Sequence, residues 1–165
     1  MIEFDGLTEF ENWGFTMFKK NLLAAAVVVI SMTGAVSAGT HDALHAAAKM
    51  ETSVWEATAA TFMHEFHYSM HTDHDNRRLA LMDIENDIML FESSMKTLMA
   101  EMPGQSAALS RVASMWEEFK ADSATIISMT DEGSTNHHHL HMKLWHGAEA
   151  LNAEIETLIT SVIEG

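Results

Sequence analysis

The sequence predicts an all-α protein: a single up-down-up-down antiparallel four-helix bundle preceded by a cleavable signal peptide. Beyond residue 38 the chain contains one proline, Pro103, and few glycines, so little in it would break a helix. Alanine, leucine, methionine and glutamate, all strong helix formers, dominate this part of the chain. Apolar residues recur at alternating steps of three and four, and no window alternates with a period of two. Long amphipathic helices with short connections are expected to pack as antiparallel neighbours.

The segment 17–38 has the features of a secretory signal peptide. Lys19 and Lys20 precede an unbroken apolar run at 22–30, and small residues lead to a cleavage site after Ala38. A membrane-spanning helix needs about 20 apolar residues, so the short run favours a cleaved signal over the alternative, an uncleaved anchor. We therefore expect the mature protein in the periplasm or outside the cell.

Residues 1–16 have the wrong charge for the front of a signal peptide, because they carry acidic residues and no Lys or Arg. We expect Met17 to be the true start and residues 1–16 to be an over-called extension. The bundle domain is then expected at 39–165.

Helix-breaking and polar segments divide this domain into four predicted helices, at 41–72, 76–102, 105–130 and 136–163. The first helix is expected to bury Leu44, Ala48, Trp55, Ala59, Phe62 and Phe66. The second is expected to bury Ile84, Ile88, Phe91, Met95, Leu98 and Met102, and the third Leu109, Val112, Trp116, Phe119, Ser123 and Ile126. The fourth is expected to bury Leu140, Leu144, Ala148, Leu151, Ile155, Leu158 and Val162. Each set falls on one helix face.

The charge and the amino-acid composition of the chain exclude several classes of binding partner. The chain holds 24 acidic residues against 9 Lys and Arg, a formal net charge of −15. Such a chain repels nucleic acid and anionic membrane surfaces, so we expect neither nucleic-acid binding nor membrane insertion after signal cleavage. The absence of cysteine excludes disulfides, c-type haem attachment and thiolate metal sites. Any metal chemistry must use histidine, methionine and carboxylate.

Histidines gather where the first helix ends and the fourth begins, and up-down topology brings these two ends to the same pole. Rotation at 100° per residue selects the side chains that face inward there and turns His64 and His71 outward. The predicted metal ligands are His67, His74, His137 and His141, with Met63, Met70 and Asp73 as auxiliaries. The pairs His137/His141 and Met63/His67 are spaced i,i+4, which lets one helix offer two ligands to one ion.

Ligand chemistry favours copper, with zinc or nickel next. Thioether and imidazole together suit copper, whereas imidazole with carboxylate suits zinc, nickel or copper(II). Haem is disfavoured: a Met from the first helix and a His from the fourth could ligate iron, but the polar cluster leaves little apolar surface for a porphyrin. Most other methionines, at 82, 89, 95, 99, 102 and 115, are interpreted as core residues.

Enzyme signatures are missing from the sequence. There are no Glu-x-x-His pairs of the di-iron type, no His-Glu-x-x-His, no phosphate loop and no Gly-x-Ser-x-Gly. We therefore expect a binding protein that buffers, carries or senses a metal ion. The alternative is a metal-free ligand-sensing or protein-interaction module, with a protein partner in the cell envelope, whose clustered histidines respond to pH.

Two predicted helices carry a family resemblance. Phe91-Glu92-Ser93-Ser94-Met95 with Leu98, followed by Leu109, Val112, Trp116, Phe119 and Ile126, resembles the periplasmic sensory domain of type IV pilus methyl-accepting chemotaxis transducers and nitrate-sensing kinases. The resemblance implies a four-helix periplasmic fold. The first helix of that family carries a Gln-Arg-Met-Leu-Ser type motif. Here Phe62-Met63-His64-Glu65-Phe66-His67 takes its place, so the ligand-contacting arginine is missing and the resemblance leaves the ligand open.

Overall fold

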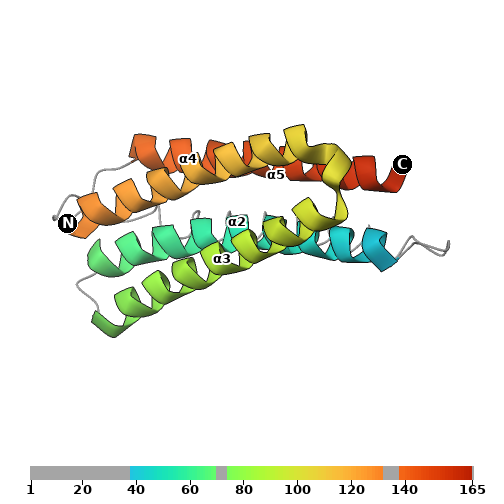
Figure 1. The fold of residues 1–165 in the computed structure, drawn as a ribbon. Helices are drawn as coiled ribbons and strands as arrows, with labels where there is room; N and C mark the ends of the chain where they lie inside the picture. The colour runs from blue at the N-terminus through green and yellow to red at the C-terminus, as the bar shows by residue number, and fades with distance from the viewer. Residues whose placement is uncertain (1–37, 70–73, 132–137, 165) are drawn as a thin grey trace. The chain divides into compact units, whose positions relative to one another are not determined.

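The computed structural model describes residues 38–69, 74–131 and 138–164, which form four α-helices, one short 3-10 helix and no β-strand (Figure 1). The helices are α2 (Ala38–Ser69), α3 (His74–Glu101), α4 (Ser106–Asp131) and α5 (His138–Glu164), with the 3-10 helix η1 at Pro103–Gln105. The predicted all-α class is confirmed. The predicted signal peptide and the extension before it lie outside the described residues.

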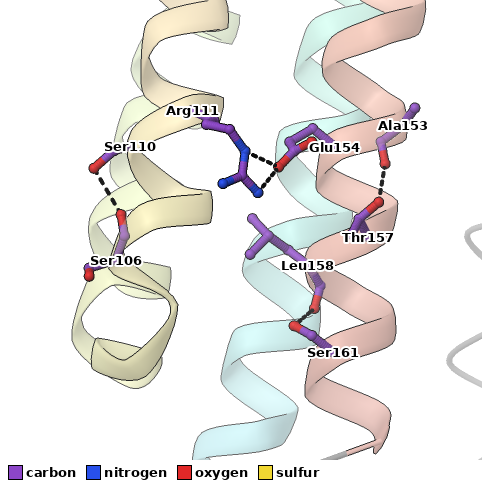
Figure 2. Close-up of polar contacts among 8 residues, drawn as sticks. All are labelled: Ser106, Ser110, Arg111, Ala153, Glu154, Thr157, Leu158 and Ser161. Atoms are coloured by element: carbon purple, nitrogen blue, oxygen red, sulfur yellow. Dashed lines mark hydrogen bonds and ion pairs between the residues drawn. The ribbon is translucent and has the colours of Figure 1, made fainter.

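Successive helices run in opposite directions (Figure 1). The start of α2 lies beside the end of α3, where a Cβ built on Gly39 would be 2.7 Å from Glu101 Oε2. The start of α4 lies beside the later part of α5, where Arg111 Nη2 donates to Glu154 Oε1 over 2.6 Å (Figure 2). The sharp connection between α3 and α4 contains Pro103, which starts η1 because a proline needs no backbone donor at the first helical position.

The core follows the predicted faces of α3, α4 and α5. All six residues expected from the third predicted helix are buried, and the Phe91 ring of α3 stacks on Trp116 with 3.8 Å between ring centroids. In α3 and α5 the expected residues are buried except Ile88, Met102 and Leu140, which pack against the core from its edge. The side chain of Val162 lies outside the described residues.

The most buried face of α2 is turned by one residue from the predicted one, although the predicted Trp55 and Phe62 pack against the core from its edge. The buried positions are Ala43, Ala47, Val54, Thr58, Thr61 and Glu65, each directly before an expected one. One residue is a rotation of about 100° around the helix axis. The cause is the large aromatics: Trp55 and Phe62 lie on the flank that faces α5, while the small side chains let α2 approach its neighbours closely. Phe66, expected inside, is exposed.

The interpretation of the methionines as core residues is wrong for three of them. Met82, Met89 and Met99 are exposed, whereas Met95 is buried and Met102 and Met115 pack at the edge of the core. Along the described helices, none is long and apolar enough to cross a membrane.

Candidate functional site

The end of α2, the start of α3, the end of α4 and the start of α5 share polar contacts at one end of the bundle. We call this group the histidine pole and define it as His64 and Glu65 of α2, Arg77 of α3, Asp131 of α4 and His141 of α5. The up-down topology explains the convergence, because His64 and His141 are brought to the same end of the bundle although far apart in sequence.

Glu65 and His141 form the contact between α2 and α5. Glu65 Oε2 contacts His141 Nε2, and both side chains are largely shielded, with 11% and 26% of their surface exposed. The Phe62 ring packs on the imidazole with 4.8 Å between centroids. This aromatic wall reduces the access of water to the pair, which strengthens an imidazole–carboxylate interaction.

His64 is buried in the bundle, so the prediction that it points outward is wrong. Only 1% of its surface is exposed, and its Nε2 lies 3.3 Å from Asp131 Oδ1. The one-residue rotation of α2 is the reason, because it carries position 64 onto the core side. The Nδ1 atom has no hydrogen-bond partner among the described residues. A neutral imidazole that donates through Nε2 therefore keeps a free lone pair inside the bundle.

Arg77 completes the other half of the pole. Its Nη2 donates to the same Asp131 oxygen that faces His64, and its guanidinium lies over the Tyr68 ring, 4.6 Å from the centroid. Stacking on an aromatic face and pairing with a carboxylate are the two interactions that hold a guanidinium best. Asp131 is thus shared by a cation from α3 and an imidazole from α2.

The structure describes only some of the predicted metal ligands. His141 lies in the pole, His67 is half-buried near the end of α2, and His74 and Met63 are exposed. Met70, Asp73 and His137 lie outside the described residues, as does His71. Within the described ranges, no three His, Asp or Glu side chains lie close enough to hold one ion, so His67, His74 and His141 do not form such a group there.

Sequence reasoning missed His64, Glu65 and Arg77 as members of the pole. The spacing of the small residues of α2 was the available signal. Ala43, Ala47, Val54 and Thr61 recur at helical spacing, and the same face extends to His64 and Glu65. The prediction placed the largest side chains of this helix in the core. The small side chains form the buried face instead, so the predicted orientation of the helix was wrong.

No family model, curated protein or solved structure matches this chain.

Proposed function

We propose that this chain is an exported metal-binding protein that holds its ion at the histidine pole of the bundle and buffers, carries or senses it. Copper is the first candidate ion, followed by zinc and nickel. The signal peptide at 17–38 and the periplasmic location belong to this proposal, as does the four-helix sensory resemblance.

The contact between Glu65 and His141 is the observation that carries the proposal. It sets a carboxylate oxygen against an imidazole nitrogen across a helix interface, and these are two of the atom types that bind zinc, nickel and copper(II). Both side chains are largely shielded from water, and the Phe62 ring packs on the imidazole. Solvent therefore competes less with an ion for these two groups. The chain's excess of acidic groups attracts cations to such a site.

Further ligands would come from the same ends of the helices. His137 precedes His141 by four residues, so both would face one ion if the helical spacing extends to it. His67, His74, Met63, Met70 and Asp73 are the other ligands of the proposed set. His64 Nδ1 offers an additional lone pair in the interior of the pole.

Calorimetric titration of the protein, purified without an affinity tag, tests the proposal with copper(II), zinc and nickel. We expect His141→Ala to weaken binding at least about tenfold, because losing even an outer-shell partner of a metal ligand costs that much. His45→Ala is the matched control, since His45 is an exposed histidine near the start of α2, at the other end of that helix. Acidification should release the ion, because only a neutral imidazole ligates. Equal affinities for the wild type and His141→Ala would exclude the assigned pole.

The alternative function is a metal-free ligand-sensing or protein-interaction module with pH-responsive histidines. The contact of the buried His64 with the partly exposed Asp131 is the observation that favours it, because a proton gained by a buried imidazole would place a charge inside the bundle. The same titration separates the two functions: protein that takes up none of the three metals at neutral pH leaves only the alternative.

A further inference from the structure

The solvent-facing side of α5 carries imidazole and thioether side chains near the start of the helix. We call this group the α5 stripe and define it as His138, His139, Met142 and His146. All four side chains are exposed, and at 100° per residue their positions span an arc of about 100° around the helix axis. The buried apolar residues of α5, such as Leu144 and Leu151, lie on the opposite side. The α5 stripe is therefore a surface feature that packing of the bundle does not require.

The spacing of the α5 stripe places Met142 at its centre. Met142 follows His138 by four residues and His139 by three, and it precedes His146 by four. Residues three or four apart are neighbours on a helix surface, with about 5–6 Å between their Cβ atoms. The three histidines are one, seven and eight residues apart from one another, so no two of them are such neighbours. Every neighbouring pair of ligands within the stripe therefore includes the Met142 sulfur.

His146 is already oriented by a carboxylate. Its Nδ1 atom lies 3.0 Å from Oε2 of Glu149, three residues further along α5. An ionised carboxylate can only accept, so Nδ1 donates and Nε2 keeps its lone pair. Metal-binding histidines commonly donate their other ring N–H to a carboxylate in this way, which fixes the tautomer and the orientation of the ring. Glu149 thus holds His146 in the tautomer in which Nε2 can bind a metal ion.

The ligand atoms of the α5 stripe select the kind of ion. In the part of the chain that the structure describes, no three His, Asp or Glu side chains lie close enough to hold one ion, so a site on the stripe must use the sulfur. Thioether sulfur selects copper(I), whereas carboxylate and carbonyl oxygens suit harder ions. The chain's net charge of −15 attracts cations of any kind to its surface. The sulfur at the centre of the stripe therefore supplies the preference for copper(I).

We propose that the α5 stripe is a copper(I) site in which Met142 Sδ is the central ligand. His146 supplies an imidazole from the turn after Met142, and His138 or His139 supplies one from the turn before it. The stripe is separate from the histidine pole, because the His141 imidazole of the pole faces Glu65 of α2. An ion on this open face can be exchanged with an external carrier. The inference stands whether or not the pole binds metal.

NMR of the tag-free protein, with isotope-labelled methionine methyl groups, tests the proposal during an anaerobic titration with copper(I). We expect the Met142 methyl signal, identified by its absence in Met142→Leu, to shift as copper(I) is added. Met89 is the internal control, because it is 61% exposed on α3 and has no histidine three or four residues away. Its signal should stay in place. A Met142 signal that does not move, or equal shifts for Met142 and Met89, would overturn the proposal.

Competition with a chromophoric copper(I) chelator measures the affinity. The comparison is made in the His141→Ala background, which removes an imidazole of the pole, so that the two sites are tested separately. Adding Met142→Leu or His146→Ala should lower the copper(I) affinity at least about tenfold, since even an outer-shell partner of a metal ligand contributes that much. Adding Met89→Leu should not change it.

Zinc affinity, measured in the same variants, should be unaffected by Met142→Leu, because the replacement removes only the sulfur. Met142 is exposed, so the leucine variant should also keep the fold. An unchanged copper(I) affinity in Met142→Leu would overturn the proposal. An equal loss of zinc affinity would overturn it as well, because the stripe would then not distinguish copper(I).

Discussion

At the histidine pole, imidazoles pair with carboxylates from other helices. His64 meets Asp131 and His141 meets Glu65, whereas His41 and His45 near the start of α2 stack on one another with exposed side chains. Burying a polar group without a partner is costly, so the free Nδ1 of His64 is a feature that packing alone does not account for. A bound ion would account for it.

Met63 gives a residue-level test of copper(I). Its side chain is 44% exposed on α2, so core packing does not explain it, and thioether is a soft ligand that favours copper(I). Met63→Leu should change the free energy of unfolding by less than about 0.5 kcal/mol, as is usual for surface replacements. It should weaken copper(I) binding and leave zinc binding intact, as measured by competition with a chromophoric chelator.

The control for that variant is Met89→Leu, which replaces an exposed methionine in the middle of α3. It should alter neither metal affinity. If Met63→Leu lowers the affinity for both metals equally, or for neither, the thioether is not a ligand and the site is built from histidine and carboxylate.

Among the helices, α2 is set apart by small side chains on its core side. Ala43, Ala46, Ala47, Ala57 and Ala60 are buried, and a buried hydroxyl pair, Thr61 with Ser123 of α4 at 2.7 Å, continues the same face. Small residues allow close approach of helix backbones, and α2 makes its most extensive contact with α3. The larger Trp55 and Phe62 fill the flank towards α5 instead.

Two alanines of α2 test this orientation. Ala57→Leu should destabilise the bundle by about 1–3 kcal/mol, because an enlarged side chain must be forced into a packed core. Ala59→Leu, on the exposed side, should change stability by less than about 0.5 kcal/mol. Thermal or urea unfolding of the two variants measures the difference. The face expected from the aromatics predicts the reverse order, so a more damaging Ala59→Leu would restore it.

The sequence was sufficient for three of the four helix faces. In α3, α4 and α5, the largest apolar residues recur at helical spacing on one face, so periodicity identifies Phe91, Trp116 and Leu151 as core, although it does not exclude Met82, Met89 and Met99, which are exposed on α3. In α2 the competing faces differ in bulk, and which one turns inward depends on how closely α3 and α5 approach, a tertiary property. The same error affected the predicted site. The topology correctly predicted that His141 lies near α2. The contact of His141 with Glu65 and the burial of His64 could not be predicted without the correct rotation of α2.

For the whole molecule, the distribution of charge agrees with a cation-binding function. The net charge of −15 attracts metal ions. Basic residues of α3, α4 and α5 pair with acids of neighbouring helices, and one of them, Arg77, reaches the pole. The pole lies at the end of α2, so this helix supplies two of the groups that we propose for the metal, His64 and Glu65.

Paramagnetic broadening by copper(II) in the NMR spectrum of the isotope-labelled protein tests the central claim most directly, because it locates the ion without assuming its ligands. At substoichiometric copper(II), amide signals around Glu65, Asp131 and His141 should disappear first, and those around His41 and His45 should persist. Chelation by EDTA should restore the signals. Broadening that begins around His41 and His45, or that spreads evenly over the acidic surface, would contradict a metal site at the histidine pole.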